Sequence, residues 1–449
     1  MNIVTRNPKT ILTGTGAATS VLEPEPETPP KPAAFVPAPI DELEDTGLPD
    51  SLISSLLYKY LLNVGEAAGR ACAAALALPS KPIVEMLSFM KNQRLVVYKD
   101  TANMGDFVYT LTEEGREVAK RCMMESSYVG ATPVPLSDYV ESVEAQTIEN
   151  EKPKRAQLEA AFKDLMICDT LFERLGPAIN SARGMLLFGP PGNGKSSIAE
   201  RVTECFGSTI WVPKAIYVEG VVINYYDPET HVAIESDTPL KAGVDYDPRW
   251  IEVKRPTIVV GGELTMDALE LRFNPVTKTT EPSLQFKSNC GTLVIDDFGR
   301  QRMDPDTLLN RWILPLEKRY DFLTLHTGKK IQVPFDQLII FSTNLEPRDL
   351  VDEAFLRRIP YKVNVEDPTE EQYRKLFRLM SEDAGIVYND AAVDHLIKKW
   401  YKATGRPLRF CHPRDLLLQI RNNASYLAVD SVMSEELLDQ ACDCYFAVL

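Results

Sequence analysis

A glycine-rich loop between an apolar strand and a helix is the sequence feature that most restricts the fold of this chain. The apolar run MLLF at residues 185–188 is followed directly by GPPGNGKSS and then by IAERVTECF, which is expected to be helical. A strand, a loop of the form G-x-x-x-x-G-K-S and a helix in this order are typical of a phosphate-binding loop. A chance glycine-rich turn would lack the flanking strand and helix. The pattern therefore predicts an α/β fold built around this loop.

The residue types in the loop are suited to binding a nucleoside triphosphate. Gly189, Gly192 and Gly194 let backbone amides curl around a phosphate, and the following helix presents its positive end to the same anion. Lys195 is expected to neutralise phosphate oxygens, and the Ser196 hydroxyl is expected to bind Mg²⁺. We therefore expect ATP and Mg²⁺ as cofactors. The predicted nucleotide-binding residues are Gly189, Pro190, Pro191, Gly192, Asn193, Gly194, Lys195, Ser196 and Ser197.

Two further apolar strands end in side chains suited to ATP hydrolysis. The run TLVI is followed by Asp296 and Asp297, and the run LIIFST is followed by Asn344. Carboxylate oxygens are preferred ligands of Mg²⁺, so Asp296 is predicted to hold the metal together with Ser196. A carboxylate committed to the cation has lost basicity, so the general base that activates water is predicted to be Asp297. Asn344 is expected to hold the water near the γ-phosphate.

Two arginine-containing segments follow these strands. DEAFLRRI carries Arg357 and Arg358 near the end of a short predicted helix. In GRPLRFCHPRDLLLQI, Pro413 is expected to open a helix that has Arg414 in its first turn. Single arginines are usually surface residues, but these follow the strand-end asparagine in order, which favours a functional role.

The order of these motifs resembles that of the AAA+ ATPases over roughly residues 155–445. By this resemblance GPPGNGKS is similar to the Walker A motif and LVIDD to Walker B. The resemblance also implies sensor one at Asn344, an arginine finger at Arg357 and Arg358, and sensor two at Arg414, with Arg409 as its competitor. An arginine finger acts on the nucleotide of a neighbouring subunit, so the resemblance implies a homo-oligomeric ring, expected to be a hexamer.

Two features depart from a minimal core of this family. Most members end Walker B with Asp-Glu, whereas this chain has Asp-Asp, as in replication initiators and helicase loaders; slow turnover and a non-hydrolysing scaffold therefore stay open. More than ninety residues separate Ile198 from Thr292, and within them IYVEGVVINYYDPETHVAIE is predicted to form a hairpin about its DPET turn.

A second predicted hairpin precedes Asn344. DFLTLHTGKKIQVPFDQLII has two strands around Thr327 and Gly328 and then the strand that leads to the asparagine. It resembles the hairpin before sensor one in the MoxR-like, protease-unfoldase and replicative-helicase branches, where such hairpins line a pore or face a client. The alternative is a structural sheet edge.

The whole chain is expected to contain five regions. Residues 1–47, with seven prolines between residues 21 and 40, are predicted to be a disordered tail. Residues 48–124 show the order of a winged-helix (α+β) domain: three helices, strand, wing, strand, helix. Residues 125–154 are predicted to be a polar connector, residues 155–366 the α/β P-loop NTPase core of the AAA+ type, and residues 367–449 a helical lid.

The charge balance bears on the role of the winged-helix region. The chain has a formal charge of -15, which repels nucleic acid over most of the surface. The region from Ser51 to Glu125 holds nine basic and eight acidic residues, whereas a DNA reader usually has a clear basic face. We therefore expect this region to dock a protein, with DNA contact through Lys81, Lys91, Arg94 and Lys99 as the alternative.

Composition narrows the remaining choices. No apolar run approaches the roughly 18 residues of a membrane span, and no signal peptide is readable, which favours a cytoplasmic protein without membrane contact. Eight scattered cysteines and four histidines lack the spacing of metal ligands. The sequence thus predicts an ATPase that remodels a protein or other macromolecular client. The alternative is an ATP-controlled DNA-binding regulator or loader. The identity of the client does not follow from the sequence.

Overall fold

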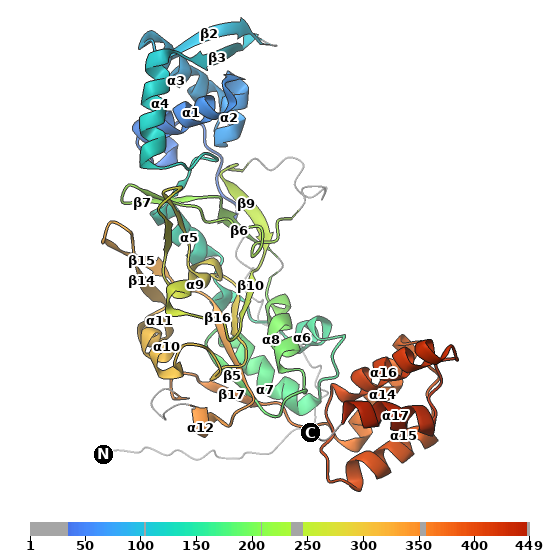
Figure 1. Ribbon diagram of the computed structural model, residues 1–449. Coiled ribbons are helices and arrows are strands. Elements are labelled where there is room, and N and C mark those ends of the chain that lie inside the picture. Colours follow the sequence, from blue (N-terminus) through green and yellow to red (C-terminus); the bar gives the residue numbers. More distant parts are fainter. Residues whose placement is uncertain (1–34, 103–104, 208, 235–245, 351–355, 447–449) are drawn as a thin grey trace, which may run out of the picture. The chain divides into compact units, whose positions relative to one another are not determined.

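Five parallel strands form the central sheet (Figure 1). The computed structural model describes residues 35–102, 105–207, 209–234, 246–350 and 356–446, all of which lie in one unit that begins at Phe35. The strands predicted at MLLF, TLVI and LIIFST are confirmed. Every neighbouring pair is parallel, so the carboxyl ends of the strands meet at one edge, where α/β folds bind ligands. The strand order is β10 (Thr257–Val260), β13 (Thr292–Ile295), β16 (Leu338–Thr343), β5 (Met185–Phe188) and β17 (Tyr361–Asn364).

Helices cover both faces of this sheet. Met185 and Leu187 of β5 belong to an apolar cluster with α6, α7 and α8, whereas Leu186 belongs to a cluster that includes Trp312 and residues of α10. A sheet that is buried on both faces requires uninterrupted apolar strands, which explains the runs MLLF and LIIF. The helices concerned are α6 (Arg155–Ala161), α7 (Asp169–Asn180), α8 (Lys195–Arg201), α10 (Pro305–Arg311) and α11 (Ile313–Lys318).

The long insertion between α8 and β13 forms two smaller sheets and a short helix. The hairpin that we expected about the DPET turn at residues 227–230 is wrong. The chain instead reverses at Glu219 and Gly220, both at positive φ, which matches the twist of a tight hairpin. The strands are β6 (Thr209–Pro213) with β9 (Trp250–Lys254), and, in sheet order, β11 (Arg272–Asn274), β12 (Thr279–Glu281), β8 (Val221–Ile223), β7 (Ile216–Val218) and β4 (Val134–Pro135); the helix is α9 (Leu284–Lys287).

The expected polar connector contains a strand and a helix that pack against this insertion. Its strand β4 pairs with β7, and its helix α5 (Leu136–Ala145) buries Tyr139 and Val143 in the insertion's apolar core. The Tyr139 hydroxyl lies 2.8 Å from the Tyr225 hydroxyl. Because the residues on the solvent face of α5 are polar, the sequence analysis did not predict this helix.

The hairpin predicted before Asn344 is confirmed. Strands β14 (Tyr320–Thr324) and β15 (Lys330–Pro334) are antiparallel, and Gly328 at φ 84° lies in the loop between them. One face of the hairpin is buried, because Leu323 and Ile331 belong to the same apolar core as α5. The opposite face is solvent-exposed at Phe322 and Lys330.

The N-terminal domain has the predicted order of helices and strands plus one unexpected strand. We expected GEAAGRACAAALAL to be one helix, but Glu66–Ala68 form strand β1, which pairs with β3. Tertiary pairing thus overrides the helical propensity of Glu-Ala-Ala. The elements are α1 (Asp50–Val64), β1, α2 (Gly69–Leu76), α3 (Ser80–Asn92), β2 (Val96–Thr101), β3 (Phe107–Leu111) and α4 (Glu113–Glu125).

Residues 35–47, which we assigned to the disordered tail, are packed against the fold. Ile40 is 7% exposed, and a 3₁₀ turn spans Glu44–Thr46. The guanidinium of Arg249, which forms a buried ion pair with Asp247, donates a hydrogen bond to the Thr46 carbonyl at 3.3 Å. The proline content therefore led us to place the end of the tail too far along the sequence. Residues 1–34 lie outside the described residues.

The C-terminal region is entirely helical in its described part. Its helices are α14 (Glu370–Asp383), α15 (Asp390–Leu396), a π-helical turn (Ile397–Lys402), α16 (His412–Leu427) and α17 (Glu435–Tyr445), and α12 (Pro347–Leu350) precedes β17. They enclose a separate apolar core. In the described part of the chain no single helix could cross a membrane; α2 and α3 together meet the length and composition criteria, but they are bent by 117°.

Candidate active site

The loop after β5 has a backbone that only glycine allows at two positions. Gly189 and Gly192 have φ angles of 134° and 83°. A Cβ atom at Gly189 would lie 2.5 Å from the Val365 carbonyl oxygen, and one at Gly192 would lie 2.6 Å from the Cys411 sulfur. The glycines therefore serve both the turn and the close approach of neighbouring segments.

Lys195 lies at the start of α8 and points along the loop. Its Nζ donates hydrogen bonds to the carbonyls of Gly189 and Pro190, both at 2.9 Å, and to Asn344 Oδ1 at 2.6 Å. The residue is 7% exposed. Burial lowers the pKa of this amine, while the nearby carboxylates of Asp296 and Asp297 oppose that shift. The structure thus brings the loop lysine and the strand-end asparagine together, as the motif order required.

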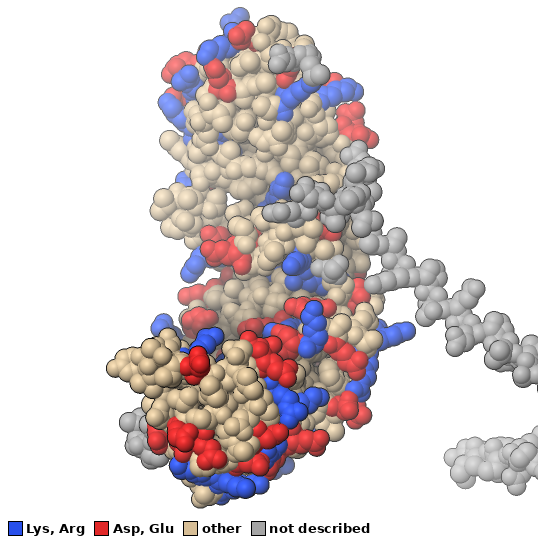
Figure 2. All heavy atoms as spheres, turned by 90° about the vertical axis from the view of Figure 1, so that its right-hand side faces the viewer, with Lys and Arg blue, Asp and Glu red and all other residues tan. Residues whose placement is uncertain are grey.

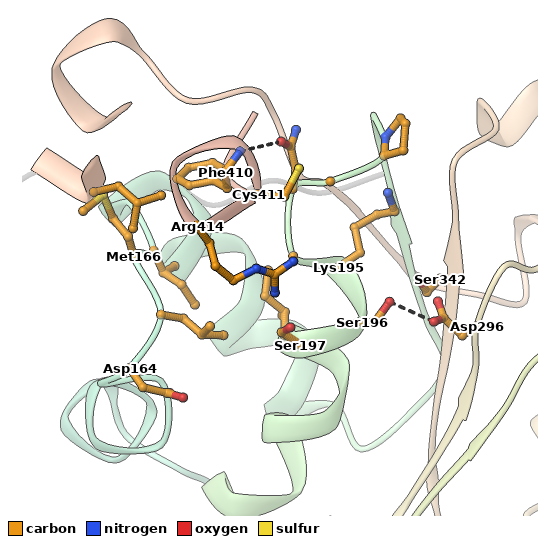
Figure 3. Close-up of a pocket in the computed structure, with 18 of the residues that line it drawn as sticks. Asp164, Met166, Lys195, Ser196, Ser197, Asp296, Ser342, Phe410, Cys411 and Arg414 are labelled. Atoms are coloured by element: carbon orange, nitrogen blue, oxygen red, sulfur yellow. Dashed lines mark hydrogen bonds between the residues drawn. The ribbon is translucent and has the colours of Figure 1, made fainter. Parts of the chain in front are cut away.

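The two adjacent aspartates have different partners. Ser196 Oγ donates a hydrogen bond to Asp296 Oδ2 at 2.8 Å, which pairs the two predicted metal ligands (Figure 3). Asn344 Nδ2 donates to Asp297 Oδ1 at 3.2 Å. Asp296 therefore lies against the phosphate-binding helix, and Asp297 lies against the end of β16. This geometry suits the division into a metal ligand and a general base.

These residues line a pocket of about 420 Å³. The pocket is also lined by the segment 164–167 before α7, by Leu376 and Met380 of α14 and by Phe410 near the start of α16. Figure 3 shows Met166 and Phe410 on one side of the loop and Asp296 on the other. The pocket thus has an apolar part beside a polar part, as a nucleotide with a planar base and a charged phosphate chain requires.

Of the two arginines that compete for the sensor-two position, Arg414 lines the pocket. In Figure 3 its side chain extends toward Ser197. Arg409 is not among the pocket's described lining residues, and its guanidinium pairs with Asp367. The preference for Arg414 therefore agrees with the geometry of the pocket.

The predicted arginine-finger residues, Arg357 and Arg358, do not lie in this pocket's described lining. Arg357 is solvent-exposed, and Arg358 Nε donates to Glu317 Oε1 of α11 at 2.9 Å. Neither is among the described residues that line the pocket. Most of the short helix predicted before them, residues 351–355, lies outside the described residues.

A junction between the loop and the C-terminal helices escaped the sequence analysis. Asn193 Nδ2 donates to Asp367 Oδ1 at 2.7 Å, and Asn193 Oδ1 accepts from the backbone N–H of Phe410 at 3.3 Å. The backbone N–H of Cys411 donates to the Gly192 carbonyl at 2.9 Å. Asn193 was predicted to bind nucleotide, but nothing in the local pattern indicates that its side chain bridges two distant segments.

The remaining histidines and cysteines form no second centre in the part of the chain that the structure describes. No group of three or more His, Cys, Asp or Glu residues there could hold a metal ion, and all eight cysteines are free. His231 is buried, and its Nε2 lies 3.1 Å from the Lys287 carbonyl oxygen. The imidazole of His231 therefore belongs to the packing of the insertion.

One family model and one relative match parts of this chain. The family described as "Domain of unknown function (DUF8689)" matches residues 369–444, within the helical C-terminal region. Spastin from Anopheles gambiae is 24% identical over 238 residues, which are 53% of this chain and 22% of that protein. The chain therefore matches about a fifth of the length of this relative.

Solved structures with similarity include two bacterial proteins. The RuvB Holliday junction branch migration motor of Thermotoga maritima is 13% identical, with 64% of this chain and 73% of that chain covered and a TM-score of 0.36. NtrX from Brucella abortus in complex with ATP is 14% identical, with 63% and 59% covered and a TM-score of 0.37.

The fold follows from the chain's own geometry together with its sequence similarity. The phosphate-binding loop follows β5, which lies between β16 and β17 in a parallel sheet, and the carboxylates follow β13. With the match to spastin, these features give the region from α6 to β17 an AAA+ ATPase-like, P-loop α/β fold.

Proposed function

We propose that this protein binds ATP with Mg²⁺ at the carboxyl edge of the central sheet and hydrolyses it. The observation that carries the proposal is the gathering of Lys195, Ser196, Asp296, Asp297 and Asn344, from three different strand ends, in one pocket. A chance glycine-rich turn would not bond its lysine to an amide that in turn bonds one carboxylate, and its serine to a second carboxylate.

The side chains suit a magnesium nucleotide. Ser196 and Asp296 offer a hydroxyl and a carboxylate oxygen that lie 2.8 Å apart, and Mg²⁺ prefers such hard oxygen ligands. When bound, the cation would neutralise charge on the phosphates. Lys195 supplies a second positive charge at the loop.

In this proposal, residues of this chain orient the attacking water and accept its proton. Asp297 would accept the proton of the attacking water, because its carboxylate is not engaged by Ser196. Asn344 would orient that carboxylate and the water through its amide, since Nδ2 already contacts Asp297 and Oδ1 already contacts Lys195. Arg414 would add positive charge from the side of the lid.

We further propose that hydrolysis drives remodelling of a macromolecular client by a homo-oligomeric ring, expected to be a hexamer. Support comes from Arg357, which is exposed to solvent and absent from the chain's own described pocket lining. In this proposal Arg357 or Arg358 acts on the nucleotide of a neighbouring subunit.

The N-terminal domain is proposed to be a winged helix that docks a protein client. Its charge balance supports this role over DNA reading, and on the face seen in Figure 2 acidic and basic side chains are interspersed on this domain at the top of the view. Three of the four basic residues on α3 and the wing also have partners: Lys81 pairs with Glu42, Lys99 pairs with Glu66, and Lys91 lies 3.7 Å from the centre of the Tyr98 ring. A DNA-binding regulator or loader is the alternative.

Two substitutions test the proposed activity. Lys195→Ala should abolish ATP binding, because it removes the loop's cation, as measured by titration calorimetry with ATP and Mg²⁺. Asp297→Asn should retain ATP binding and lose about 10²- to 10⁴-fold in phosphate release, because an amide cannot accept a proton. Unchanged phosphate release by Asp297→Asn would show that Asp297 is not the base. Unchanged ATP affinity of Lys195→Ala would refute the binding site.

A further inference from the structure

The backbone at Asp297 adopts a conformation that its residue type seldom occupies. Asp297 has φ 48°, in the left-handed region, and Gly299 follows at φ 97°. A Cβ atom at Gly299 would lie 2.4 Å from Leu350 Cδ1, so the turn also has no room for a side chain there. A non-glycine residue in the left-handed region persists only where its surroundings hold it. Something must therefore stabilise the turn that carries the proposed base.

The side-chain amide of Gln301 makes three hydrogen bonds to this turn. Its Nε2 donates to the carbonyl oxygens of Asp296 at 2.9 Å and of Asp297 at 3.1 Å. Its Oε1 accepts from the backbone N–H of Gly299 at 2.8 Å. One amide therefore uses both donors and its acceptor to hold the backbone on either side of the Asp297 carboxylate.

Gln301 reaches the site only through the backbone of the turn that carries Asp296 and Asp297. It is not among the described residues that line the pocket, whereas Asp297 is. The Asp297 carboxylate accepts a hydrogen bond from Asn344, and the backbone carbonyl of the same residue accepts one from Gln301. Two side-chain amides thus act on Asp297, one at the end of β16 and one inside the turn.

We propose that Gln301 is a positioning residue that holds the turn at residues 296–299 so that the Asp297 carboxylate meets the attacking water. The inference rests on the proposed role of Asp297 as the base. Misplacement of a catalytic group by about 1 Å can cost about 10²-fold in rate. Loss of the Gln301 amide should therefore reduce kcat and leave ATP binding intact.

The test uses two variants of the full chain. Gln301→Met keeps the length of the side chain and removes all three hydrogen bonds, and Gln301→Glu keeps only the acceptor for Gly299. We expect kcat to fall by about 10- to 100-fold in both, with unchanged ATP affinity and KM. Gln440→Ala, at an exposed amide pair with Asn423 in the lid, is the matched control and should match the parent.

A double variant separates positioning from general stabilisation. If Gln301 acts through Asp297, then Asp297→Asn with Gln301→Met should be no slower than Asp297→Asn alone in single-turnover assays. A further 10-fold loss in the double variant, or a parental kcat in Gln301→Met, would overturn the inference while the base assignment stands. Parental hydrolysis by Asp297→Asn would instead overturn the assignment of the base, and this inference with it.

Discussion

Asp296 and Asp297 are neighbours in the sequence, yet their environments differ in a way that suits different chemistry. Asp296 continues the direction of β13, and its backbone N–H donates to the Val260 carbonyl of the adjacent strand at 2.8 Å. Asp297 leaves the strand through a left-handed turn. The change of backbone direction sends the two carboxylates to different partners, Ser196 and Asn344. A strand that ended in a regular extended residue would not separate them in this way.

His412, at the start of α16, is a second residue with a strongly altered environment. Burial, followed by the charge of Arg409, lowers its pKa to about 4. Its Nδ1 lies 2.9 Å from the Tyr401 hydroxyl, which lies 2.9 Å from the Tyr373 hydroxyl. The imidazole is therefore neutral at pH 7 and belongs to a buried polar chain inside the C-terminal helical region.

This lowered pKa predicts acid sensitivity. An unfolded histidine has a pKa of about 6.5, so between pH 6.5 and 4 the unfolded state binds more protons than the folded one, and stability falls as the pH falls. Above pH 6.5 the contribution is fully present. Thermal unfolding followed by circular dichroism should show a smaller loss of Tm between pH 7 and pH 4.5 in His412→Gln than in the parent. The exposed His326 provides the control His326→Gln, and equal pH profiles for both variants would contradict the prediction.

At the scale of elements, the phosphate-binding loop is joined to the helical region through Asn193. The side chain contacts Asp367 before α14 and Phe410 before α16, so two separate segments of the C-terminal helical region meet the loop at one residue. Because the same loop binds phosphate in our proposal, a change in the loop would reach the lid through this contact.

The junction can be tested by hydrogen exchange. Asn193→Ala removes the acceptor of the Phe410 N–H, and a typical hydrogen bond contributes about 1 kcal/mol. We expect roughly fivefold faster exchange in peptides that cover residues 409–411, with no change in residues 416–420 of the lid core. Asn422→Ala, at an exposed asparagine of α16, is the matched control. Equal exchange at residues 409–411 in both variants would show that Asn193 does not hold the lid.

At the scale of the whole molecule, the described pocket contains Lys195 and Arg414 but neither Arg357 nor Arg358. Arg357 is solvent-exposed, and Arg358 is bound to Glu317 on the flank of the α/β fold. In the proposed ring these arginines serve a neighbouring subunit, so turnover would depend on assembly.

Mixing of variants tests this dependence. Arg357→Ala should lose turnover with little loss of ATP binding, because an arginine finger contributes about 10³- to 10⁵-fold in rate. Mixing Arg357→Ala with Lys195→Ala should restore part of the activity, since each subunit supplies what the other lacks. Arg421→Ala, an exposed lid arginine, is the control. Parental kinetics of Arg357→Ala and Arg358→Ala would exclude this segment from the site.

The sequence by itself determined the parts of the protein in which function and local structure coincide. MLLF, GPPGNGKS, TLVIDD and LIIFSTN specify strands that end in polar residues, and the parallel sheet then brings Lys195, Asp297 and Asn344 together. Apolar runs and glycine-rich loops are local signals, because burial on both faces and backbone freedom each leave a mark on neighbouring residues.

Only the tertiary structure decided features that depend on residues far apart in the chain. Glu66–Ala68 form a strand because they pair with β3. Helix α5 packs against the insertion, where the Tyr139 hydroxyl contacts that of Tyr225. No local sequence pattern indicates the hydrogen bonds of Asn193 and Gln301. Each side chain bonds backbone groups that only the fold brings close to it. Contacts of this kind arise from chain topology, which local residue patterns do not encode.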